Sequence, residues 1–131
     1  MVNISDVIRN QYPHFLYIRT SGAEATQDED GSWVTPASAW TFHSRSREET
    51  NGIGSTVQAA NGVFVTFSSL IQLPAGTPRV AEGTEIAVTD RELLPSELSD
   101  DTVKANPEGI VRVSGTCQKF DLGRLHCRLW V

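Results

Sequence analysis

Histidine side chains are the first groups in this sequence to test for metal binding or proton transfer. His14, His43 and His126 lie far apart in the chain and show neither H-x-H nor H-x-x-x-H spacing. A metal site or an acid–base pair needs a defined set of groups held at fixed distances. The spacing therefore predicts no metal site, no cofactor and no catalytic histidine. We expect His126 on the polar face of a strand, beside Arg128.

Three further motifs resemble known sites, but each lacks part of the pattern. The acidic segment 28–31 (DEDG) has neither the alternating carboxylates nor the twelfth-position glutamate of a calcium loop. No G-x-S-x-G elbow surrounds Ser44, Ser68 or Ser69. The G-I-G segment at 52–54 is followed by no helical pattern, so we expect no phosphate cradle there. The sequence thus predicts no enzyme.

The two cysteines, Cys117 and Cys127, are too few for a disulfide framework or a zinc site. If they face each other across a hairpin, their Cα atoms lie about 4.5 to 5.5 Å apart, within reach of a disulfide. In a reducing cytoplasm we expect instead two free, buried thiols that pack together.

Composition places these side chains in one globular domain, residues 1–131, which is 39% hydrophobic and 21% charged. A chain of this length buries enough surface to hold a core without metal or disulfide. The net charge of -5 argues against a protein that binds nucleic acid by neutralising phosphates. Neither a membrane span nor a signal peptide is evident, so we expect the chain to be made in a cytoplasm.

The elements that must position these side chains are mainly strands, recognised by alternating apolar residues and by turn signals. We expect an all-β fold, a small antiparallel β-barrel or sandwich. It would carry a short N-terminal helix at 4–10 and one helical turn near 97–103. Two polar segments, 45–61 and 90–109, are expected as projecting loops. The expected strands are 14–20, 33–34, 40–45, 63–68 continuing through 70–73, 85–88, 110–120 and 124–131.

The last two expected strands form a C-terminal hairpin around the loop 121–123. A three-residue loop that ends in glycine favours a left-handed Gly123. This register pairs Phe120 with Arg124 and places Cys117 opposite Cys127, with one apolar and one polar face. Trp130 then falls on the polar face, where a partner or a barrel neighbour must cover it. We take Trp130 as a candidate interface residue.

Arginines near the start of the polar segment 45–61 are a second candidate for contacts. The chain has nine arginines but only two lysines, and arginine suits bidentate pairing with carboxylates at interfaces. Arg45 and Arg47 directly precede Glu48 and Glu49. An ordinary surface ion pair within this segment is the alternative.

The order of these segments resembles that of the head-closure, or stopper, proteins of long-tailed bacteriophages. The resemblance covers nearly all of the chain after the first strand, although each motif alone is generic. The motifs are the acidic turn before Trp33, W-x-F-x-x-R-x-R-E-E-x-N at 40–51, the strand at 61–74, E-G-T-E-I-x-V at 82–88 and the closing segment at 113–131.

The resemblance implies a structural virion protein of the phage neck that forms a ring, typically of twelve copies. Its partners would be an adaptor protein on the capsid side, tail proteins on the other, and double-stranded DNA that passes without specific binding. Acidic subunits suit this role because they repel phosphate. The resemblance also implies a loop that lines the channel. By position this is 45–61, with candidate residues Arg45, Arg47, Glu48, Glu49 and Asn51, and with 81–83 and 90–109 as other contacts.

Two other classes stay open. One is another β-rich neck or tail protein, although a tail terminator or tube protein usually couples its sheet to a substantial helix, and only 4–10 is available. The second is a non-viral β-barrel, either a binding module or a cupin-like enzyme. A cupin would need histidines and a glutamate that converge inside the barrel.

Overall fold

The computed structural model describes residues 10–20, 26–27, 29–34, 39–59, 61–94, 97–106 and 109–131. Within these residues the chain is mostly β, with one short helix of six residues. The elements are β1 (His14–Thr20), β2 (Thr26–Gln27), β3 (Trp33–Val34), β4 (Ala39–Thr50), β5 (Thr56–Gln58), β6 (Phe64–Thr66), β7 (Ser69–Pro74), β8 (Glu85–Thr89), α2 (Asp100–Ala105), β9 (Val111–Thr116), β10 (Lys119–Asp121) and β11 (His126–Trp130).

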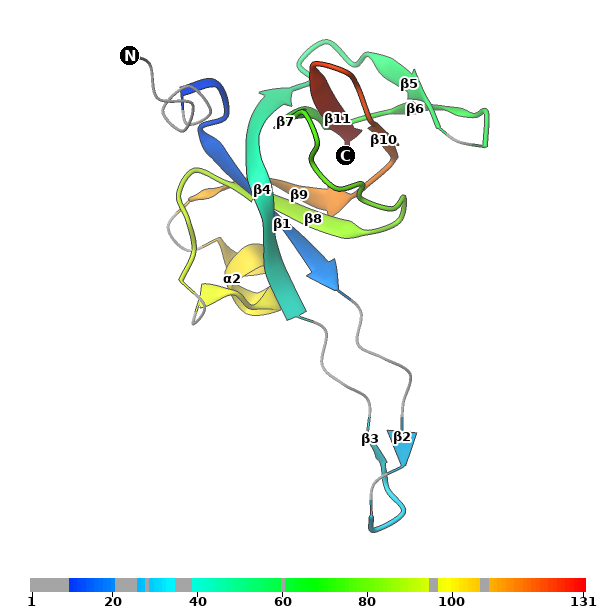
Figure 1. Ribbon diagram of the computed structural model, residues 1–131, viewed down its shortest axis with the longest axis vertical. Coiled ribbons are helices and arrows are strands. Elements are labelled where there is room, and N and C mark those ends of the chain that lie inside the picture. The colour runs from blue at the N-terminus through cyan, green and yellow to red at the C-terminus, as the bar shows by residue number, and fades with distance from the viewer. Residues whose placement is uncertain are drawn as a thin grey trace.

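Seven of the strands form one antiparallel sheet in the order β10-β11-β7-β4-β1-β8-β9. The other four form two separate hairpins, β2–β3 and β5–β6. The long strand β4 joins the two halves of the sheet: Ala39 to Ser46 pair with β1, whereas Arg47 to Thr50 pair with β7. Figure 1 shows β4 bending through the middle of the molecule. A strand that passes from one half of a sheet to the other lets the sheet curl over a core.

The expected closed barrel is only partly present, because the seven-stranded sheet stays open. Among the described residues no ladder joins the two edge strands, β9 and β10. They follow each other along the chain, separated by Cys117 and Gln118. The Cys117 amide donates to the carbonyl of Thr84 (2.8 Å), whereas that of Gln118 donates to the carbonyl of Trp130 (2.7 Å). The chain thus crosses between the halves instead of turning back to pair β9 with β10.

The main core lies between the two halves of the curled sheet. Leu16 and Ile86 come from one half and Ile71 and Leu129 from the other, and all four have no exposed surface. Full burial of such a side chain contributes about 1.5–3 kcal/mol. The inward-facing apolar side chains of the two halves therefore meet when the sheet curls, which favours the curl.

The described parts of the segment 90–109, residues 90–94 and 97–106, pack against the outer face of β1 and β8 instead of forming a bare loop. Helix α2 begins after Ser99, whose side chain accepts a hydrogen bond from the Thr102 amide (3.2 Å). Val103 then joins a second core cluster that contains Tyr17. The Tyr17 hydroxyl accepts a hydrogen bond from the Leu93 amide (2.7 Å), which ties this segment to β1.

The expected loop at 45–61 is wrong in its first part. The polar run from Arg45 to Thr50 belongs to β4, and only 51–55 and the β5–β6 hairpin remain of the predicted loop. The helix predicted at 4–10 lies, apart from Asn10, outside the described residues. In the part of the chain that is described, no helix is long and apolar enough to cross a membrane.

The predicted register of the C-terminal hairpin is also wrong. β10 pairs with β11 so that Phe120 faces Leu129, while β9 pairs with β8. This register buries both of those side chains and leaves Leu125 in the turn, 85% exposed. Gly123 is required there because a Cβ would collide with the His126 carbonyl, not because its φ is positive.

Candidate functional site

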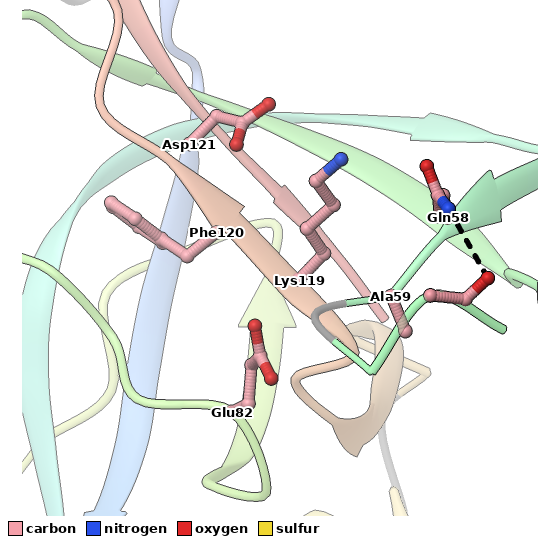
Figure 2. Close-up of a pocket in the computed structure, with 7 residues that line it drawn as sticks. Gln58, Ala59, Glu82, Lys119, Phe120 and Asp121 are labelled. Atoms are coloured by element: carbon pink, nitrogen blue, oxygen red, sulfur yellow. Dashed lines mark hydrogen bonds between the residues drawn. The ribbon is translucent and has the colours of Figure 1, made fainter.

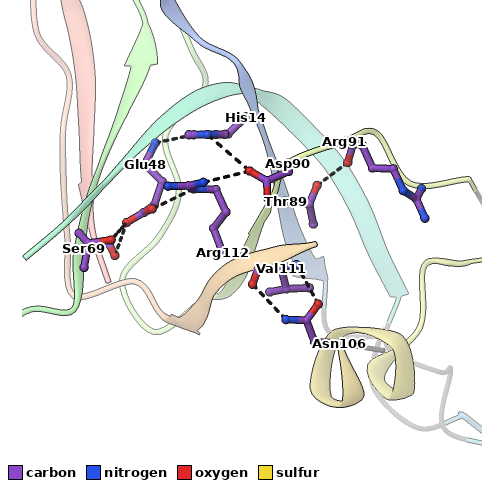
Figure 3. A network of polar contacts seen from close by, with 10 residues as sticks. His14, Glu48, Ser69, Thr89, Asp90, Arg91, Asn106, Val111 and Arg112 are labelled. Carbon is purple, nitrogen blue, oxygen red and sulfur yellow. Dashed lines mark hydrogen bonds and ion pairs between the residues drawn. The ribbon is translucent and has the colours of Figure 1, made fainter. Parts of the chain in front are cut away.

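The buried carboxylate of Glu48 is the centre of a polar cluster, shown in Figure 3. Its side chain is 2% exposed and faces the inside of the curled sheet. One oxygen, Oε2, accepts hydrogen bonds from Ser69 Oγ (2.7 Å) and Thr50 Oγ1 (2.9 Å). The other, Oε1, accepts from Arg112 Nε (3.0 Å). Three donors on one carboxylate are the arrangement that a buried charge requires.

The charge of Glu48 follows from these contacts. Burial alone raises the pKa of this carboxyl group. The hydrogen bonds from Ser69, Thr50 and Arg112 outweigh burial and hold the pKa below its ordinary value. Glu48 is therefore ionised at neutral pH.

Arg112 extends the cluster to Asp90 and His14. Its NH1 group donates to Asp90 Oδ1 (3.0 Å), and His14 Nε2 lies 3.7 Å from the same oxygen. His14 Nδ1 accepts a hydrogen bond from the Glu48 amide (3.0 Å), so the ring proton of neutral His14 sits on Nε2, facing Asp90. Burial and the nearby Arg112 lower the pKa of His14. The histidine is thus neutral at pH 7.

This cluster is suited to holding strands together. It joins His14 at the start of β1, Glu48 on β4, Ser69 on β7 and Arg112 on β9. All the hydrogen bonds of the Glu48 carboxylate come from the protein itself. A carboxylate occupied in this way is poorly placed to act as a base or to bind a ligand.

The structure does not bring the predicted contact residues of β4 to one surface. Arg45 lies over the Phe15 ring (4.2 Å) and donates from Nε to the Tyr12 carbonyl (3.0 Å). Arg47 is exposed and pairs with Glu49 (3.3 Å). By strand alternation Arg45, Arg47 and Glu49 share one face of β4, whereas Glu48 faces inward on the other.

The side chains of Asn51 and Trp130 both contact other residues of the same chain. The Asn51 amide group donates to the carbonyls of Ser55 (2.9 Å) and Phe67 (2.7 Å), which shapes the turn after β4. Trp130 is 8% exposed, and the cations of Lys119 and Arg128 each lie 5.4 Å from the centre of its ring. The neighbours that cover this aromatic ring thus belong to the same chain.

The cysteines are free and buried, as expected, although they are not cross-strand partners. Burial raises the pKa of Cys117 to about 11, so its thiol is inert at neutral pH. No group of three or more His, Cys, Asp or Glu side chains within the described ranges is arranged to hold a metal ion. Ser46 Oγ is fully buried and has no hydrogen-bond partner in the same set of residues.

A groove of about 400 Å³ lies between the tip of the β5–β6 hairpin and the edge strand β10. Figure 2 shows the Lys119 side chain standing between those of Asp121 and Gln58. Val63 and Phe64, on the hairpin beside the groove, are 56% and 67% exposed. The lining residues are Gln58, Ala59, Gly62, Glu82, Lys119, Phe120 and Asp121.

Neither a family model, nor a curated protein, nor a solved structure matches this chain. Sequence reasoning missed the groove and the partners of Glu48. Arg112 lies 64 residues from Glu48, and no local pattern links the two.

Proposed function

We propose that this chain is a ring-forming structural protein of the neck of a long-tailed bacteriophage. In that role it closes the DNA channel after packaging and docks the tail. The proposal rests on the segment order, which resembles that of head-closure proteins. The structural observation that carries it is the presence of two small hairpins outside the main sheet.

The two hairpins are built for contact with other chains. A lone two-stranded hairpin is marginally stable in water, and exposed large apolar side chains mark interaction sites. The β5–β6 hairpin has only three residues per strand and exposes Val63 and Phe64. The β2–β3 hairpin has two residues per strand, and among the described residues no ladder joins it to the main sheet. An assembly protein accounts for both features.

The curled sheet supplies the rigid body of the proposed subunit. In this proposal it acts as a small barrel, joined at one corner by Cys117 and Gln118 and held at another by the Glu48–Arg112 contact. Of the parts of the predicted channel loop that lie outside β4, the segment 51–55 exposes Ile53 by 90%. We assign this loop to the channel wall, because residues 51–55 carry no cation that would hold the phosphates of passing duplex DNA.

Deletion of the gene in its phage, followed by electron microscopy of the lysate, tests the proposal. We expect separate tails beside capsids that packaged DNA and then lost it. Supplying the wild-type chain from a plasmid should restore whole virions. Normal virions without the chain would remove it from the neck, and attached tails of abnormal length would favour a tail terminator instead.

A further inference from the structure

Three cations around β10 lack a carboxylate partner within 4 Å among the described residues: Arg79, Lys119 and Arg124. Lys119 begins β10 and Arg124 lies in the turn that follows it. Arg79 lies near Cys117, two residues before β10: burial and Glu82 raise the pKa of that thiol, and Arg79 lowers it in part. Ion pairs are present for most other arginines, namely Arg19, Arg47, Arg91, Arg112 and Arg128. In a chain of net charge -5, this end of the molecule is locally basic.

Lys119 is the cation that lines the groove beside β10. The groove also contains two carboxylates, but that of Asp121 is paired with Arg128 (3.8 Å). The second carboxylate belongs to Glu82, which appears below Lys119 in Figure 2. Beside the groove, the exposed Val63 and Phe64 offer apolar surface. A segment that carries negative charge at its tip fits this combination.

The turn of the β2–β3 hairpin is such a segment. It presents Glu29 and Asp30, both exposed. Its shape is fixed by Gly31, with φ +81°, and by a hydrogen bond from the Gln27 side chain to the Gly31 carbonyl (2.9 Å). In Figure 1 this hairpin and the β5–β6 hairpin lie at opposite ends of the molecule. The acidic turn thus meets the groove of another copy, not its own.

We propose that the acidic β2–β3 turn of one copy docks into the groove between β5–β6 and β10 of the next, with Glu29 facing Lys119. This inference rests on the proposed ring and names the contact that builds it. Because the two surfaces differ, each copy can donate a turn to one neighbour and receive one from the other. Such head-to-tail contacts close into rings, whereas a self-complementary patch would give a dimer.

Charge reversal in a phage that lacks the gene tests this contact, with plaque number as the readout. Lys119→Glu and Glu29→Lys, each supplied from a plasmid, should both reduce plaque number at least about tenfold through like-charge repulsion. The double variant, which exchanges the two charges, should restore it. Lys104→Glu, on α2 away from the groove, is the matched control and should complement like wild type. Thermal unfolding of each purified variant must match wild type, which separates folding defects from docking defects.

Reduced plaque number in both single variants and recovery in the double variant support the docking contact. Full complementation by either single variant, or no recovery in the double variant, overturns it and leaves the proposed function intact. Normal virions in the deletion strain would instead overturn the proposed function itself, whatever the charge variants do.

Discussion

Arg112 on β9 and Glu48 on β4 are in direct contact (3.0 Å), although two strands, β1 and β8, lie between β9 and β4 in the sheet. Neighbouring strands are about 4.8 Å apart, so a flat sheet would hold these strands too far apart for a single side-chain bond. The contact therefore requires the sheet to curl, and it stabilises that curl.

Removal of the Glu48 charge should destabilise the fold. We expect Glu48→Gln to lower the free energy of unfolding by roughly 1–3 kcal/mol, because Arg112 loses a charged partner and Gln cannot accept as many hydrogen bonds. Urea unfolding measures this change. Glu49→Gln, exposed on the same strand, should stay within about 0.5 kcal/mol of wild type. Equal effects at both positions would show that burial of Glu48 is irrelevant.

Stability should fall as the pH drops below the ordinary pKa of histidine, and His14 is one cause. Burial and Arg112 lower its pKa from 6.5, so the unfolded chain binds a proton that the folded chain resists. This contribution is present above pH 6.5 and is lost as the pH falls through the lower folded value. Glu48, whose pKa is also lowered, adds a second loss as the pH falls below 4.5, through its own folded value.

Urea unfolding at about pH 7.5 and about pH 5.5 separates the His14 contribution. From the higher to the lower pH, the free energy of unfolding should fall less in His14→Gln than in wild type. His126→Gln, outside this cluster, serves as the control and should behave like wild type. An unchanged pH dependence in His14→Gln would exclude His14 as a contributor.

The buried hydroxyl of Ser46 predicts a stabilising substitution. Its Oγ has no hydrogen-bond partner within the described part of the chain, so the fold carries an uncompensated cost of desolvation. Ser46→Ala should raise the free energy of unfolding by roughly 1 kcal/mol. Ser44→Ala, on the same strand, is a useful comparison because Ser44 Oγ lies 2.9 Å from His43 Nδ1. If Ser46→Ala is the more destabilising of the two, the hydroxyl has a partner after all.

Gly115 is the position on β9 where a methyl group does not fit. A Cβ there would lie 2.9 Å from a methyl carbon of Val131. Gly115→Ala should cost about 1–3 kcal/mol through overpacking, visible as a lower unfolding temperature. Gly52→Ala is the matched control, since nothing lies within 4 Å of its Cβ position and its φ is not positive. An unchanged unfolding temperature in Gly115→Ala would mean that β9 and Val131 do not pack as closely as described.

Substitution of Trp130 tests whether this side chain belongs to the core of the chain or to an interface with a partner. Because the ring is 8% exposed, Trp130→Ala should cost about 3–5 kcal/mol in the isolated chain. A residue reserved for a partner would instead leave the melting temperature of the isolated chain unchanged and weaken only assembly. Thermal melting followed by circular dichroism decides between them.

Much of the strand pattern could be predicted from the sequence, because alternation and turn residues act locally. The strands 14–20 and 33–34 match β1 and β3, and 85–88 lies within β8. The extension of β4 to Thr50 could not be predicted, because Glu48 faces inward and looks like a loop residue. Only Arg112 and Ser69, both remote in sequence, make its burial favourable.

The C-terminal register illustrates a second limit. Gly123 and the apolar alternation favoured a tight hairpin between 110–120 and 124–131. That pattern does not indicate that β9 pairs with β8, or that Phe120 must face Leu129 to reach the core. Strand partners are chosen by the whole core, whereas turn signals report only on nearby residues.

The pairing of β1 with β8 has a consequence for how fast the chain folds. Phe15 lies opposite Thr89, so the whole segment between these two residues must close into a loop when this ladder forms. Domains dominated by such distant pairings fold in milliseconds to seconds, whereas helical bundles need microseconds to milliseconds. Newly made copies therefore keep exposed strand edges for longer than a helical protein of this size. Association between copies at that stage would compete with correct assembly.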